Sequence, residues 1–220
     1  MLVRGLAVLS ATLCLCAAQE QPAPGKERPK EYPSVQPRIA PTDYQAHAQA
    51  GPITIGAEFA GHSVPTPEAT YTTEDYVVVE IGLYGAADAH AQISMNDFSL
   101  NVNGKKTPLG AEPFGLVLSS LKDPSWEPPD SKSKSKGGGI STGGGGDSNS
   151  PPPVVHMPME LQHAMAQRTQ KAALPLGDRV LPQAGLLFFK YRGKTEKINS
   201  LELIYSGSAG KATLKLHPGH

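Results

Sequence analysis

The feature that most constrains the fold of this chain is the alternation of apolar and polar residues over short segments. DYVVVEIGLYG, residues 75–85, is the strongest example, because Val77, Val79, Ile81 and Leu83 fall on one face of an extended chain. A period of two is typical of a β-strand with a buried face. The opposite face of this segment is also partly apolar, so we expect it to be covered except at its ends.

Similar segments recur along the chain and are separated by turn residues. They lie at residues 53–59, 92–109, 114–121, 185–191, 200–207 and 211–216. The segment 92–109 contains a hairpin, and for 114–121 a strand is favoured with a short turn of helix as the alternative. Asn103-Gly104 predicts a tight hairpin turn, since both residues tolerate positive φ. The segment 206–210 predicts a second tight turn. About seven short strands with frequent turns favour an all-β fold, and specifically an immunoglobulin-like β-sandwich over residues 51–217.

Two consecutive segments interrupt the predicted sandwich. Residues 122–156 are rich in Gly, Ser and Pro, and such a composition buries too little apolar surface to offset the entropy of ordering. We therefore expect a disordered loop there. Residues 157–174, MPMELQHAMAQRTQKAAL, predict a helix with Pro158 in its first turn. Its apolar stripe is weak, so the helix is expected to lie on the domain and not inside it.

The first 50 residues predict export. Residues 1–18 combine a basic residue, an apolar stretch and small residues at the end, which is typical of a cleaved secretory signal peptide. A bacterial lipoprotein signal is the alternative. Residues 19–50 contain six prolines and predict a disordered, Pro-rich leader. Both cysteines, Cys14 and Cys16, lie in the signal peptide, and a mature chain without disulfides fits a bacterial secreted or periplasmic protein.

The charge balance disfavours two classes of partner. The chain has 20 basic and 20 acidic residues, so it offers no net field for nucleic acid or an anionic membrane. No second apolar run of spanning length follows the signal peptide, and no integral membrane segment is expected after cleavage.

Gly193-Lys194-Thr195 resembles the end of a nucleotide-binding loop. Such a loop needs a glycine five residues before the Gly-Lys pair, and a helix after it. Phe188 occupies the glycine position, and the residues that follow predict a strand. The sequence therefore indicates a solvated hairpin connection and no bound cofactor.

Fragments of hydrolase motifs occur without their context. Ser119-x-x-Lys122 lacks the partner motifs of penicillin-recognising enzymes, and the segment 206–210 joins two strands where a nucleophile elbow needs a helix. A hydrolase would have to assemble dispersed residues through tertiary structure. The candidates for that alternative are Asp75, Asp97, Glu112, His90 and Ser119.

Histidines and the single tryptophan are the remaining candidates for a binding site. The histidines are His47, His62, His90, His156, His163, His217 and His220. They show no zinc-binding spacing and no cysteine partner, so they are interpreted as exposed and no metal ligand is assigned. Trp126 is interpreted as an anchor for the start of the Gly-rich loop, with a ligand platform as the alternative.

Two parts of the chain resemble a known class of exported proteins. MNDFSLNVNGKKTPL with LSSLKDPSWEPP, and the C-terminal segment ALPLGDRVLPQAGLLFFKYRGKTEKINSLELIYSGSAGKATLKL, resemble uncharacterised exported proteins of acidobacterial-type soil bacteria. These are similar to secreted bacterial immunoglobulin-like domains of unknown function. The resemblance implies the fold and export, and it carries over no catalytic or binding residue.

Together these features predict an exported, non-enzymatic binding or structural accessory protein of the cell envelope, with a protein as its possible partner. A secreted hydrolase and a histidine-based metal-binding protein are the alternatives. The sequence assigns no catalytic, cofactor-binding or metal-binding residue.

Overall fold

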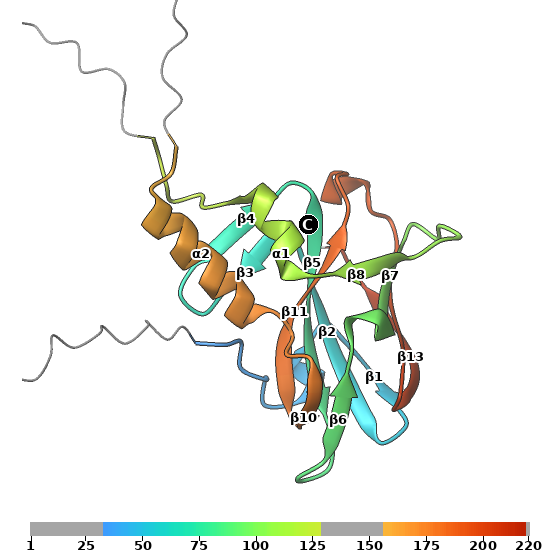
Figure 1. The fold of residues 1–220 in the computed structure, drawn as a ribbon. Helices are drawn as coiled ribbons and strands as arrows, with labels where there is room; N and C mark the ends of the chain where they lie inside the picture. The colour runs from blue at the N-terminus through green and yellow to red at the C-terminus, as the bar shows by residue number, and fades with distance from the viewer. Residues whose placement is uncertain (1–32, 129–155, 219–220) are drawn as a thin grey trace, which may run out of the picture. The chain divides into compact units, whose positions relative to one another are not determined.

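A computed structural model describes residues 33–128 and 156–218 (Figure 1). The predicted signal peptide, the first part of the predicted leader and most of the predicted Gly/Ser/Pro-rich loop lie outside these residues. The described part of the chain is mostly β, as the sequence predicts, and it carries one longer helix.

Eight strands form one antiparallel sheet in the order β1-β2-β5-β11-β8-β7-β12-β13 (Figure 1). Their bounds are β1 Ala46–Ala50, β2 Ile53–Gly61, β5 Tyr76–Tyr84, β7 Phe98–Val102, β8 Leu109–Glu112, β11 Gln183–Lys190, β12 Leu201–Gly207 and β13 Gly210–Leu216. The short strand β8 joins the two halves of the sheet: Leu109 and Gly110 pair with β7, and Ala111 and Glu112 pair with β11.

Two smaller sheets flank the large one. β6 (His90–Ile93) pairs with β10 (Gly177–Val180), and β3 (Ser63–Pro65), β4 (Thr70–Thr73) and β9 (Leu121–Lys122) form the other. The helices are α1 Phe114–Val117 and α2 Met159–Ala172, with single 3-10 turns η1 Pro41–Asp43, η2 Met95–Asp97, η3 Leu118–Ser120 and η4 Thr195–Lys197.

The large sheet curls until its two edge strands, β1 and β13, lie beside each other. Just before β1, the side-chain amide of Gln45 donates to the carbonyl oxygen of His217 at 2.7 Å. The β1–β2 turn also packs closely against the β12–β13 turn, since a Cβ on Gly51 would lie 2.1 Å from the Ala209 carbonyl oxygen. The sheet is therefore nearly closed, and little of either edge strand remains open for pairing.

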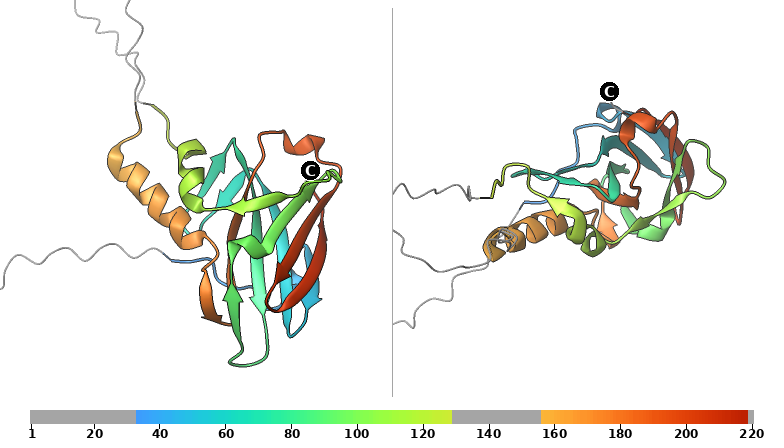
Figure 2. Two further views of the ribbon diagram at one scale, coloured as in Figure 1. Left: turned by 45° about the vertical axis from the view of Figure 1, so that its right-hand side comes forward. Right: turned by 90° about the horizontal axis from the view of Figure 1, so that it is seen from above.

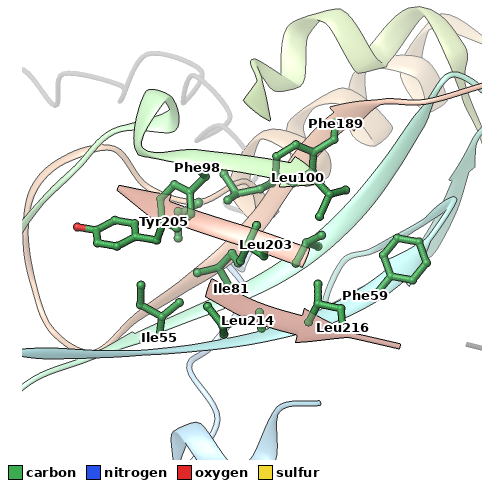
Figure 3. Close-up of a cluster of buried hydrophobic side chains, with 14 of the residues drawn as sticks. Ile55, Phe59, Ile81, Phe98, Leu100, Phe189, Leu203, Tyr205, Leu214 and Leu216 are labelled. Carbon is green, nitrogen blue, oxygen red and sulfur yellow. The ribbon is translucent and has the colours of Figure 1, made fainter. Parts of the chain in front are cut away.

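The main core fills the inside of the curled sheet (Figure 3). β5 and β11 contribute Val79, Ile81, Leu187 and Phe189, and these face apolar residues of β2, β7, β12 and β13. The alternating residues of β12, Leu201, Leu203 and Tyr205, are buried, and the residues between them are partly exposed. This alternation is the physical basis of the strand pattern in the sequence.

A second core covers the outer face of β5 and β11. It contains Val64, Tyr71, Tyr76, Val78, Val117, Leu121, Met165, Ala172, Leu186 and Phe188. α1, α2 and the β3-β4-β9 sheet supply the covering side chains, and α1 and α2 lie side by side on this face (Figure 2). The covered second face that the sequence predicts for residues 75–85 is confirmed, and the predicted helix over 157–174 is confirmed as α2.

The prediction of a strand over residues 114–121 is wrong. These residues form α1 and η3, and only Leu121 enters a strand. Pro113 precedes the helix with a φ of −62°, which suits a helix start. Val117 of α1 and Leu121 of β9 are both buried in the second core.

The two predicted tight turns are present. Asn103 and Gly104 have φ values of 55° and 63°, and the amide of Lys105 donates to the Val102 carbonyl at 3.3 Å. Ser206 pairs with Lys211, and Gly207 with Gly210. The second turn therefore closes a β-hairpin, whereas the strand after the first turn pairs with β7 only from Leu109 onward.

The prediction of a disordered leader up to residue 50 is wrong for its last part. Residues 46–50 form β1, and Tyr44 is buried across β2 and β5. Its ring lies over Gly56 and Gly82, which face each other in the two strands. A Cβ on Gly82 would lie 2.5 Å from the Tyr44 hydroxyl oxygen, so the two glycines create the space that the ring occupies.

Arg38 holds the same segment in place by charge. Its Nε and Nη2 donate to the two carboxylate oxygens of Glu80 at 3.3 and 3.1 Å, and its Nη1 pairs with Glu58. The guanidinium lies 4.3 Å from the centroid of the Tyr44 ring. Burial lowers the pKa of Arg38, but the hydrogen bonds and charges of the two glutamates outweigh it and raise the pKa overall. Burial also raises the pKa of Tyr84, whose hydroxyl donates to the Arg38 carbonyl at 2.9 Å.

Candidate functional site

An apolar hollow of about 490 Å³ lies between η3 and the start of α2. We call it the methionine groove and define it by Leu118, Leu121, Met157, Met159, His163 and Met165. Ser119, Gln162 and Ala166 complete its lining. Its two walls come from segments on either side of the predicted loop, and they meet because α1 and α2 pack on the same face of the sheet (Figure 2).

The sequence of α2 places these side chains. Met159 and His163 are four residues apart, so they lie one turn apart on the same helix face. Met165 points to the second core and is buried. Pro158 is the N-cap and lets the chain enter the helix from an extended conformation. The side-chain amide of Gln162 donates to the Met157 carbonyl at 2.7 Å, which holds the residue before the helix against its first turn.

Exposed apolar side chains lie on α2 and on α1, which leads into η3, and one of them, Met159, lines the groove itself. Leu116 is 54% exposed, Met159 61% and Leu161 44%. Such residues scattered singly are ordinary, but a group beside an apolar hollow indicates an interaction surface. Methionine side chains are flexible and polarizable, so they can adapt to ligands of different shape.

Gly193-Lys194-Thr195 lies at a second hollow, of about 430 Å³. The loop connects β11 to β12, and these strands pair with other strands and not with each other. The prediction of a hairpin connection is therefore wrong. Thr195 begins the single 3-10 turn η4, and strand β12 follows it, so the helix that a nucleotide-binding loop needs does not follow Gly193-Lys194-Thr195. Two cations that line this hollow are paired: Arg192 binds Asp75 at 2.8 and 3.1 Å, and Lys122 binds Glu74 at 2.5 Å.

His62 ties this loop to the sheet. Its Nδ1 lies 2.7 Å from the Tyr76 carbonyl oxygen, and its Nε2 lies 2.9 Å from the Gly193 carbonyl oxygen. Its ring also stacks with Tyr191 at a centroid distance of 6.5 Å. His62 therefore has a structural role that its position in the sequence does not reveal.

A third hollow, of about 540 Å³, lies between residues 34–37 and the C-terminal end of α2. Its walls include Phe114, Leu174 and Pro182. Part of this wall is the described end of the predicted leader, so the leader contributes to the surface of the folded unit.

The five dispersed hydrolase candidates are separately engaged. Asp75 binds Arg192, Glu112 accepts from the Tyr76 hydroxyl at 3.1 Å, and His90 lies 3.2 Å from Asp178. Ser119 donates to the Leu116 carbonyl at 3.1 Å. Burial raises the pKa of Asp97. Among residues 33–128 and 156–218, none of the five hydrogen-bonds another of the set, and only Ser119 lines one of the three hollows.

The histidines do not converge in the described part of the chain. His47 is on β1, His90 on β6 and His163 on α2, and no group of three or more His, Cys, Asp or Glu residues there could hold a metal ion. His156 and His217 lie at the ends of the described ranges, and His220 is outside them. Trp126 is half-buried beside the predicted loop, with its backbone amide donating to the Asp123 carbonyl at 3.2 Å; its anchoring role stays a prediction.

The methionine groove was not predicted from the sequence, because its methionines form no spacing motif that marks a binding site. A usable signal was present in HMPMELQHAM, residues 156–165, which holds three of the five methionines of the chain. At the level of sequence these residues also fit a helix with an ordinary apolar face, and only the packing of η3 against α2 turns them into a groove.

No helix in the described ranges is long and apolar enough to cross a membrane. No protein-family model matches the chain, and comparison with curated proteins and with solved structures gave no match.

Proposed function

We propose that this protein is an exported, non-enzymatic binding module of the cell envelope that holds a partner in the methionine groove. The observation that supports the proposal is the set of exposed apolar side chains on the helices beside that groove. Met159 lines it, Leu161 lies two residues further along α2, and Leu116 lies in α1 just before η3. Burying such side chains is favourable by about 25 cal/mol per Å² of apolar surface removed from water. A partner that covers them supplies the burial that the isolated chain lacks.

The scaffold suits a binding role. The nearly closed sheet gives the groove a rigid base, since Met165 and Leu121 belong both to the groove and to the second core. The partner therefore meets side chains that are already fixed in position, which reduces the entropy lost on binding. We also propose that the scaffold is an immunoglobulin-like sandwich. Strand β8 links a β1-β2-β5-β11 half to a β7-β12-β13 half, and the inner faces of the two halves enclose the main core.

Export and a partner in the envelope follow from the predicted signal peptide at residues 1–18. Cleavage before Gln19 would leave the Pro-rich leader ahead of the folded unit, and such a leader extends the reach of a tethered domain.

Site-specific photo-crosslinking tests the proposal. The full chain is produced with a photo-reactive phenylalanine analogue in place of Leu161, an exposed residue of α2 next to the lining residue Gln162, or of Lys211, an exposed residue of β13. Each is irradiated in cell-envelope extract, and cross-linked proteins are identified by mass spectrometry. We expect one partner to be cross-linked from position 161 and not from 211.

A competition variant makes the result specific to the groove. Leu116→Ser, in α1 just before η3, should remove the cross-link from position 161 without lowering the melting temperature, because Leu116 is exposed and belongs to neither core. Equal capture from positions 161 and 211, or capture that Leu116→Ser leaves unchanged, would refute a binding role for the groove.

A further inference from the structure

We propose that the methionine groove binds a soft monovalent metal ion, Cu(I), through the thioethers of Met157 and Met159 and the imidazole of His163. The inference goes beyond the proposed function, because it adds a metal ion to the groove that is proposed to hold a partner.

The donor atoms in the groove select this metal. Thioether sulfur is a soft ligand that favours Cu(I), and imidazole also binds copper well. Hard cations such as Ca²⁺ and Mg²⁺ need carboxylate or carbonyl oxygens. The described residues that line the groove include three methionines and one histidine but no Asp or Glu. The site therefore offers sulfur and nitrogen where a hard-metal site offers charged oxygen.

The local structure places the three donor residues on the lining of one groove. Met159 and His163 occupy adjacent turns of one face of α2, and both line the groove. Met157 lines it from the residue before the N-cap, where the hydrogen bond from Gln162 holds its backbone. Two thioethers and one imidazole make three donors, a number that suits a small closed-shell ion without fixed geometric demands.

Exposure separates Met159 from the methionines that pack against the second core, which are the buried Met165 and the partly buried Met157. A methionine that only fills a core should be buried, and Met165 is, at 8% exposure. Met159 is 61% exposed and belongs to neither core. Packing therefore does not account for Met159, whereas a metal ligand at the mouth of a groove must be accessible. The other methionines of the chain are Met1 and Met95, and Met95 lies in η2, away from the groove.

Competition with a chromophoric Cu(I) chelator under anaerobic, reducing conditions tests the inference. The full chain carries Cys14→Ser and Cys16→Ser, so that thiols do not bind the metal. In this background Met157→Leu, Met159→Leu and His163→Gln are compared with Met95→Leu as the matched control. Met→Leu conserves volume, and His163 is exposed, so melting temperatures should be unchanged without metal.

We expect one Cu(I) to be withdrawn from the chelator per chain. Each of the three groove substitutions should weaken binding about tenfold or more, and Met95→Leu should have no effect. Ag(I), a redox-inert analogue, should shift the NMR methyl signals of Met157 and Met159 and leave that of Met95 in place.

Three results would overturn the inference: no withdrawal of Cu(I), the same affinity in the triple groove variant, or an equal loss in Met95→Leu. Uptake of Zn(II) without Cu(I) would overturn it as well, because the thioethers would then have no part. If Cu(I) binding fails while cross-linking from position 161 still depends on Leu116, only the metal inference is wrong. If both fail, the groove is not a binding surface and the proposed function is wrong too.

Discussion

The substitution Gly82→Ala tests how the end of the predicted leader is attached to the sheet. A Cβ at this position would lie 2.5 Å from the Tyr44 hydroxyl oxygen and 2.6 and 2.7 Å from two ring carbons. These distances are well inside van der Waals contact, so the ring must move away from the strand. A Cβ on the facing glycine, Gly56, would also meet the Tyr44 ring, at 2.5 Å, so the ring packs closely against both glycines.

Two limits set the size of the effect. Forcing extra volume into a packed site costs about 1–3 kcal/mol when the neighbours give way. Complete expulsion of the ring is bounded by the cost of truncating a buried aromatic residue, about 3–5 kcal/mol. Tyr44 is only 5% exposed, so we expect Gly82→Ala to lower the free energy of unfolding by about 2–4 kcal/mol. At about 2–4 °C per kcal/mol for a chain of this size, the melting temperature should fall clearly.

Urea unfolding followed by circular dichroism measures the loss, and Gly110→Ala is the matched control. Gly110 is also a strand glycine, but nothing lies within 4 Å of the position of its Cβ. Its substitution should therefore change stability by less than about 0.5 kcal/mol.

A double-mutant cycle isolates the contact itself. In a Tyr44→Ala background the clash partner is missing, so Gly82→Ala should cost less than about 0.5 kcal/mol. If Gly82→Ala costs as much without the Tyr44 ring as with it, the glycine serves the strand in another way and the reasoning is refuted.

Two further perturbations address charge and hydrogen bonding. Burial raises the pKa of Asp97, so the native protein binds a proton on this carboxylate more tightly than the unfolded chain does. At neutral pH the ionised carboxylate therefore destabilises the fold. This destabilisation disappears as the pH falls through the folded-state pKa. Asp97→Asn should therefore melt at a higher temperature than the wild type at pH 7, and the difference should shrink in acid; a difference independent of pH would contradict the assignment. His62→Phe can keep the stack on Tyr191 but loses the contacts with the carbonyl oxygens of Tyr76 and Gly193, so urea unfolding should show a loss of about 1–3 kcal/mol. His47→Phe, at an exposed position on β1, is the control and should change little.

The sequence by itself determined where most strands lie. The alternation in β5 and β12 is visible because side chains of an extended chain point to opposite faces in turn, and this is a property of neighbouring residues. The turns at Asn103-Gly104 and residues 206–210 were also predictable, since positive φ and short connections depend on residue type. The segment 114–121 failed because its apolar residues fit a strand and a helix equally well until Val117 and Leu121 meet the second core.

Only the tertiary structure decided which strands pair and where a ligand can bind. β11 pairs with β5, about a hundred residues earlier in the chain, and β8 divides its short length between β11 and β7. Tyr44 is fixed by two glycines that a hydrophobic pattern does not register. The methionine groove joins residues of η3 to residues of α2. In each case the deciding contact is between residues far apart in the chain, and local propensity carries no information about which distant surface a side chain will meet.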